Sequence, residues 1–157
     1  MINQKPASCR FFNMKMMNDF PLTSPTILQH YVLVRKWSSD IEFFKIETYF
    51  LHRLLDEYFL RLCNSYLVKE LKITGERLLA LEKQQRRAAR ALRRQILETK
   101  WISKDLIQVN NDRITEAQVD IEYLMAQVTI EFKAIKKDVF KLVEKQRQRD
   151  RLLTPND

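Results

Sequence analysis

Six cations between Lys83 and Arg94 are the residues of this chain whose types and spacing most clearly suggest chemistry. The segment KQQRRAARALRR has no acid among its twelve residues. At 100° per residue, all six cations of a helix with this sequence fall within an arc of about 120°. We call this set the basic stripe; its members are Lys83, Arg86, Arg87, Arg90, Arg93 and Arg94. Ammonium and guanidinium groups clustered in this way bind phosphates and carboxylates.

Three interpretations of the basic stripe compete. The preferred one is structural, because exposed ion pairs are common on helical surfaces and need no function. In this interpretation the cations pair with acids of the neighbouring helices, which are Asp40, Glu42, Glu47, Glu122 and Glu131. Within the same helix, four residues apart, Glu82 pairs with Arg86 and Glu98 with Arg94. The second is a docking face for an acidic protein or a second copy of the chain. The third is non-specific binding of nucleic acid.

Residues suited to catalysis or metal binding do not form a recognisable site. The two histidines, His30 and His52, are 22 residues apart on one predicted helix, about 33 Å along its axis, and cannot share a site. His30 is instead expected to be a hydrogen-bonded core residue. Two cysteines are too few for a structural zinc site, and one glycine is too few for a phosphate-binding loop. We therefore expect no catalytic residue, metal, cofactor or small-molecule substrate.

Aromatic side chains are unusually frequent in the first predicted helix. Any that stay exposed would form a patch for binding another protein. The candidates for this patch are Phe43, Tyr49, Phe50 and Phe59. Trp37 and Trp101 fall on or beside apolar stripes, so both are expected to pack in the core.

The elements that must position these residues are predicted to be helices. A chain of 157 residues with one glycine and four prolines lacks the turn residues that a sheet needs. Apolar residues recur at alternating spacings of three and four, which is typical of helices that pack along a seam. The fold class is therefore all-α, as an elongated antiparallel up-down-up three-helix bundle with long helices.

Each predicted helix has its own seam. Ser24 and Pro25 mark the start of the first, Gly75 allows a bend or a later start in the second, and Asn111 or Asp112 can cap the third, which runs to about Arg147. The first seam comprises Ile27, His30, Val34, Trp37, Ile41, Phe44, Thr48, Leu51, Leu55, Tyr58 and Leu62. The second helix, from about Tyr66 to Leu106, uses Leu71, Leu78, Leu81, Ala88, Leu92, Ile102 and Leu106. The third uses Ile114, Ile121, Met125, Val128, Phe132, Ile135, Val139 and Leu142.

Further apolar residues of the first helix are expected to widen its seam so that it faces two neighbours: Phe43, Ile46, Phe50, Leu54 and Phe59.

The chain is predicted to hold one folded domain. We interpret residues 1–26 as a flexible N-terminal arm, 27–148 as the bundle and 149–157 as a C-terminal tail. Within the arm, Met14, Met16 and Met17 are alternative translation start sites. The net charge of +8 divides into +2 on the arm and +6 on residues 66–109. No run of about 18 uncharged apolar residues and no secretory signal is present, so a cytoplasmic location away from membranes is expected.

One stretch of the first helix carries a resemblance. His30, Trp37 and WSSDIEFFKIETYFLHRLLDEY, residues 37–58, are similar to the first helix of short uncharacterised three-helix proteins of Bacteroidetes type. In those proteins a His and a Trp precede an aliphatic-Phe-(Phe/Tyr)-Lys-x-Glu segment. The resemblance implies three long helices over residues 27–148 and no particular activity.

These patterns together predict a binding protein rather than an enzyme. We expect a helical interaction or scaffold module, with the first helix as its candidate surface for self-association. Its partner would be a protein or a second copy of the chain. The alternative function is non-specific nucleic-acid binding through the basic stripe.

Overall fold

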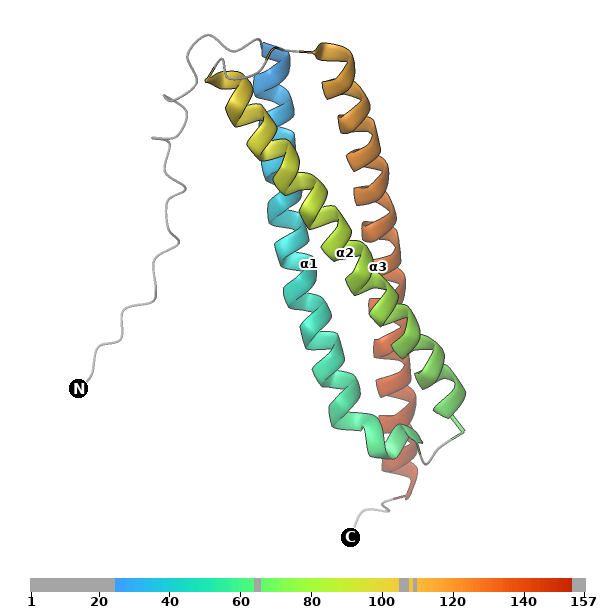
Figure 1. The fold of residues 1–157 in the computed structure, drawn as a ribbon. Coiled ribbons are helices and arrows are strands. Elements are labelled where there is room, and N and C mark those ends of the chain that lie inside the picture. The colour runs from blue at the N-terminus through green and yellow to red at the C-terminus, as the bar shows by residue number, and fades with distance from the viewer. Residues whose placement is uncertain (1–24, 64–65, 105–107, 109, 154–157) are drawn as a thin grey trace, which may run out of the picture.

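The computed structural model describes residues 25–63, 66–104, 108 and 110–153, and its elements are three long helices. They are α1 (Pro25–Cys63), α2 (Val68–Ser103) and α3 (Asn111–Leu153). Successive helices run in opposite directions and every pair is in contact, so the fold is an elongated antiparallel three-helix bundle (Figure 1). The predicted all-α class is confirmed. The predicted arm before Pro25 lies outside the described residues.

The ends of the helices differ in part from the sequence prediction: α2 starts two residues later and ends three residues earlier than predicted, and its N-cap, Leu67, makes no side-chain hydrogen bond. α1 begins at Pro25, as expected for a residue with a fixed φ and no N–H. At the start of α3 the capping side chain is Asn110, whose Oδ1 accepts the Arg113 N–H at 3.0 Å. The prediction had placed this cap one or two residues later. α3 also continues to Leu153, so the first residues of the predicted tail, 149–153, are helical.

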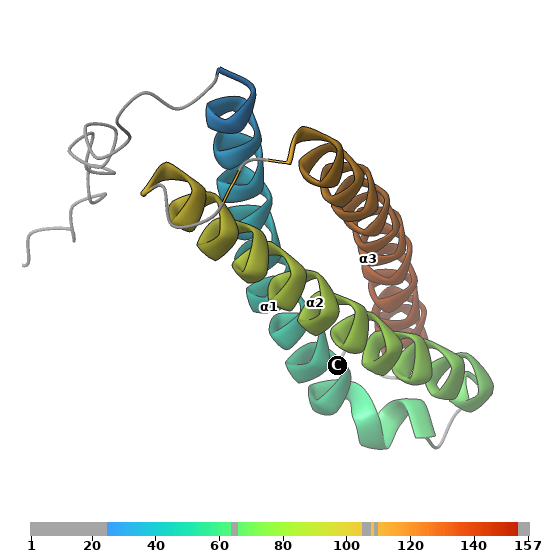
Figure 2. The same ribbon diagram turned by 45° about the horizontal axis from the view of Figure 1, so that its top comes forward.

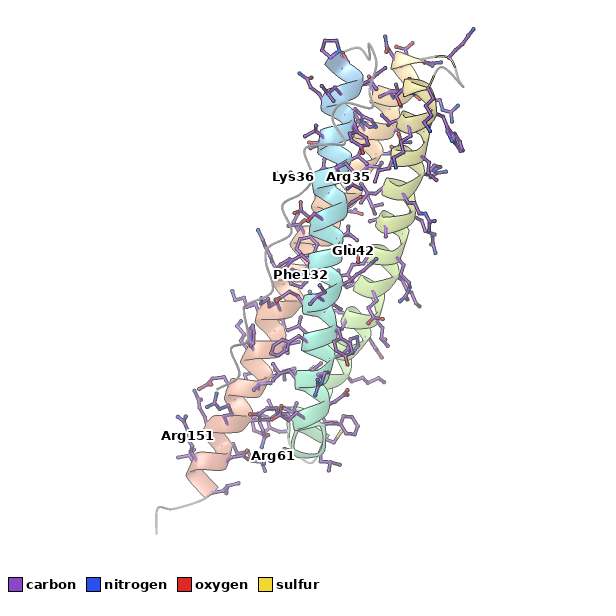
Figure 3. The ribbon with its side chains drawn as sticks, turned by 90° about the vertical axis from the view of Figure 1, so that its left-hand side faces the viewer. Arg35, Lys36, Glu42, Arg61, Phe132 and Arg151 are labelled. Carbon is purple, nitrogen blue, oxygen red and sulfur yellow. The ribbon has the colours of Figure 1, made fainter. Side chains whose placement is uncertain are left out.

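The three predicted seams form the core. All eight seam residues of α3 are buried, and in α1 only Trp37, Phe44 and Tyr58 of the eleven are half-buried, packed against the core. Phe132 of α3 lies beside α1 (Figure 3), and its ring centroid is 4.7 Å from that of Phe44. In α2 the predicted seam is buried as well, apart from Leu106, which lies outside the described residues. Periodicity therefore identified which face of each helix turns inward.

Polar side chains occupy several seam positions and link the helices. His30 is 2% exposed, and its two ring nitrogens lie 3.2 Å from Gln118 Oε1 of α3 and 3.3 Å from Gln95 Oε1 of α2. Gln85 of α2 is equally buried and donates to Thr48 Oγ1 of α1 at 2.8 Å. The expectation that His30 is a hydrogen-bonded core residue is confirmed. Because each layer needs partners from different helices, these residues define the register of the bundle.

The end of the bundle where α1 finishes is closed by ion pairs between helices. Arg61 of α1 donates to Asp150 of α3 at 2.9 Å, and Lys145 of α3 bonds Glu70 of α2 at 2.9 Å. Arg61 and the last turns of α3, around Arg151, lie together at this end in Figure 3. These exposed pairs orient the helix ends and contribute little free energy individually.

Gly75 lies inside α2, which runs through it as one helix. A β-carbon added there would meet nothing within 4 Å. We predict that Gly75→Ala raises the free energy of unfolding by about 0.5–1 kcal/mol, because alanine loses less backbone entropy in a helix. Urea denaturation followed by circular dichroism measures the change. Leu78→Ala, one turn away and fully buried, serves as the contrast and should lower stability by about 2–5 kcal/mol. Destabilisation by Gly75→Ala would contradict the open surroundings of this residue.

Candidate interaction surfaces

The basic stripe lies on the outside of α2, and all six of its cations are exposed. Within the described part of the chain, only Arg86 has an ion pair, with Glu82 at 3.5 Å and four residues away. The helix-helix pairs proposed for the stripe from sequence do not occur. The acids expected to meet it bind other cations: Glu42 pairs with Lys45, Glu47 with Lys136, Glu131 with Arg77, and Glu98 with Arg113.

The structural interpretation of the stripe is therefore wrong for five of its six members. Only the local prediction, Glu82 with Arg86, is confirmed. Register between the helices explains the rest, because it places the acids of α1 and α3 opposite cations outside the stripe. Arg77 of α2, for example, donates to both Glu131 at 3.0 Å and Asp138 at 2.5 Å of α3. The hydrogen bond with Glu131 raises the pKa of Arg77, which stays charged.

The stripe divides between two sides of α2. Arg86 borders a small hollow of about 160 Å³ with Lys45 and Tyr49 of α1. Arg87, Arg90 and Arg94 line a larger cleft of about 660 Å³ between α2 and α3. Helical periodicity places Arg93 within about 20° of Arg86, on the α1 side. The stripe therefore presents three arginines to an open groove and two cations to α1.

A second cleft of about 430 Å³ adjoins the first at the end of the bundle where α3 begins. Arg94 lines both clefts, so the two form one groove along α2 and α3. Trp101 lines the second cleft and is 49% exposed, which corrects the prediction that it packs in the core. Trp37, the other tryptophan, does pack against the core. Trp101 was misassigned because a position beside an apolar stripe does not show how far the contact with the neighbouring helices extends; the adjacent Ile102 is the residue that packs with Ile27 and Ile114.

The predicted aromatic patch is exposed on α1, with one member displaced. Phe43, Tyr49 and Phe50 are each more than half exposed, and Ile46, 68% exposed, lies between them. At 100° per residue these four share an arc of about 120° on the outward face of α1. Phe59 is also half exposed, but it lies about 140° around the helix from Ile46 and is separate from the others.

The expectation that these residues widen the seam of α1 is wrong for Phe43, Ile46, Phe50 and Phe59. Of the five residues proposed to widen it, Leu54 alone packs against the core. We call Phe43, Ile46, Tyr49 and Phe50 the α1 patch.

The second histidine of the chain pairs with an acid of α2. His52 Nε2 lies 2.9 Å from Glu82 Oε1, away from His30. The described residues contain no group of three side chains able to hold a metal ion. None of their helices is long and apolar enough to cross a bilayer.

If the stripe arginines have no structural partner, removing their charge should leave folding intact. We predict that Arg87→Gln, Arg90→Gln and Arg94→Gln each change the free energy of unfolding by less than about 0.5 kcal/mol. Arg77→Gln, on the same helix, should lower it by about 1 kcal/mol because two ion pairs to α3 are lost. Chemical denaturation of the four variants measures both effects. Equal losses in all four would show that the stripe is part of the folding energetics.

Comparison with known proteins adds no further information about these surfaces. No family model, curated protein or solved structure matches the chain. The function must therefore be inferred from the residues that the bundle exposes.

Proposed function

We propose that this protein acts in the cytoplasm as a non-enzymatic helical interaction module that self-associates through the outward face of α1. The observation that supports this proposal most strongly is the α1 patch. Four large side chains in an eight-residue segment, Phe43 to Phe50, are each more than half exposed on one helix face. Single exposed apolar residues are ordinary on protein surfaces, but a contiguous group of this size is typical of an interface.

The sequence of this face is complementary to itself. In a two-fold antiparallel pairing, each residue of one helix lies opposite the residue equally far on the other side of the symmetry axis. With the axis at Ile46, this side chain meets Ile46 of the second copy. Phe43 is level with Tyr49 of the second copy, and Phe50 of that copy, one residue farther along, lies on the same side of the face as Phe43, so the two phenylalanine rings adjoin across the interface. Their rings bury large apolar areas and pair favourably edge to face or offset.

Charges on the same face also complement one another in this pairing. Glu42 of one copy falls beside Arg53 of the other, and Ser39 lies opposite Arg53. Glu42 already bonds Lys45 within its own helix at 2.7 Å, so the carboxylate can bridge two cations. A parallel pairing would instead set Glu42 against Glu42 and Arg53 against Arg53. The charges therefore favour the antiparallel dimer.

A second function is supported by a separate observation, the exposed cations of α2. Five of the six stripe residues have no ion pair among the described residues, so their charge is available to a polyanion. We propose polyanion binding, with nucleic acid as the ligand, as this alternative function. The two functions use different helices and do not exclude each other.

The dimer is tested by introducing a charge at its centre. We predict that Ile46→Asp converts the dimer to a monomer, because two carboxylates would be buried against each other at the axis. Ile130→Asp on α3 is the matched control, since Ile130 has the same 68% exposure but lies on another helix; it should leave the dimer intact. Sedimentation equilibrium at tens of micromolar measures the mass. A monomeric unmodified protein would refute self-association.

The antiparallel arrangement has its own test in the charges. Glu42→Arg should raise the dissociation constant of the dimer at least about fivefold, because the new arginine would lie beside Arg53 of the second copy. Adding Arg53→Glu to this variant should restore the affinity. Equilibrium dissociation constants from sedimentation report both steps. An additive loss in the double variant would contradict this pairing.

Polyanion binding is tested by its dependence on salt. We predict that affinity for a labelled oligonucleotide falls steeply between about 50 and 200 mM salt, because bound cations displace counterions. The combined variant Arg86→Gln, Arg87→Gln, Arg90→Gln and Arg93→Gln should lose most of this dependence. Fluorescence anisotropy measures the affinities. Binding that is indifferent to these four changes would exclude the stripe as the site.

A further inference from the structure

The groove between α2 and α3 combines cations with exposed aromatic rings. Figure 2 shows these two helices diverging toward the end of the bundle where α3 begins. The residues that line the two clefts occupy this region: Arg87, Arg90 and Arg94 on α2, and Tyr123 on α3, in the first cleft, with Trp101 and Arg113 in the second. Tyr123 is 66% exposed and Trp101 49%. Both rings are therefore accessible from solvent beside the arginines.

The charge of the groove is positive along its length. Asp120 is the one acid lining the first cleft, against three arginines. In the second cleft Glu98 is matched by Arg113, whose guanidinium lies 3.1 Å away, which leaves Arg94 uncompensated there. A ligand that follows the groove must therefore carry negative charge at repeated intervals.

Exposed aromatic rings distinguish between the possible anions. An acidic peptide gains little from flat rings, whereas the bases of a single strand stack on them while its phosphates pair with arginine. In a duplex the bases are already stacked on each other and cannot reach Tyr123 or Trp101. From Arg87 to Trp101 the groove extends about 21 Å along α2, the length of about six stacked nucleotides.

We propose that the α2–α3 groove binds single-stranded nucleic acid, with Arg87, Arg90 and Arg94 on the phosphates and Tyr123 and Trp101 as stacking platforms for bases. This inference rests on the second function proposed above and narrows it to one ligand class and one side of the stripe. In a three-helix bundle the α2–α3 groove faces away from the outward side of α1. Both copies of an α1-mediated dimer therefore keep the groove open.

The experiment compares binding of a labelled oligothymidylate of about ten nucleotides with that of a duplex of the same length, by anisotropy at about 50 and 200 mM salt. The single strand should bind at least about tenfold more tightly. Arg87→Gln, Arg90→Gln and Arg94→Gln combined should reduce the slope of log affinity against log salt by about 2, since each phosphate contact contributes about 0.7. Arg86→Gln with Arg93→Gln, on the α1 side, should change the slope by less than half as much.

The aromatic platforms are tested separately from the charges. Tyr123→Leu and Trp101→Leu should each weaken single-strand binding about fivefold or more, while Tyr123→Phe, which keeps the ring, should bind normally. Tyr66→Leu is the control, because Tyr66 is 73% exposed at the opposite end of the bundle and should have no effect.

The outcomes separate the two proposals. Equal affinity for duplex and single strand, with no effect of the leucine variants, would overturn the groove assignment and leave polyanion binding by the stripe. Displacement of the oligonucleotide by poly-glutamate at equal charge concentration would identify an acidic protein segment as the occupant and overturn the nucleic-acid assignment. Absence of binding to either oligonucleotide at about 50 mM salt would overturn both.

Discussion

Alignment of the three helices depends on polar side chains buried in an otherwise apolar seam. Leucine, isoleucine and valine ridges can pack in several registers, since each apolar residue is much like the next. His30 allows only one register, because sliding α1 by one heptad would move its ring nitrogens away from Gln95 and Gln118. An unpaired buried polar group costs about 1–3 kcal/mol, and the pair Gln85 and Thr48 adds the same constraint farther along the bundle. The layers thus select one register.

That register determines which chemical groups face solvent. It joins acids of α1 and α3 to Lys136 and Arg77, and so leaves five of the six stripe cations of α2 without an ion pair among the described residues. It also turns the second apolar face of α1 outward, with Ile46 at its centre. The α1 patch faces away from the α2–α3 groove, although Tyr49 of the patch and Arg86 of the stripe border one small hollow. One molecule can therefore contact a second copy through α1 while its α2–α3 groove holds an anionic ligand.

Sequence periodicity predicted the fold and the core closely, because burial in a helix bundle follows spacings of three and four. It failed where an assignment depended on a partner outside the helix. Phe43 and Trp101 are apolar enough for a core, and their exposure follows from where the neighbouring helices pass. The pair of Glu82 with Arg86 was predictable since it lies within one turn, whereas that of Glu47 with Lys136 required the register. The sequence pattern of neither α2 nor α3 indicated the groove, because the groove forms only where the two helices lie side by side.

Oxidative footprinting of side chains across a dilution series tests the central claim, that this packing leaves the α1 patch outside and available to a second copy. In dilute protein, Phe43, Tyr49 and Phe50 should react quickly, while Phe44 and Phe132, whose rings pack together in the core, stay protected. As concentration rises, Phe43 and Phe50 should become protected and Phe140 on α3 should not. Rapid oxidation of Phe44 and Phe132 in dilute protein, or patch reactivity independent of concentration, would contradict the account.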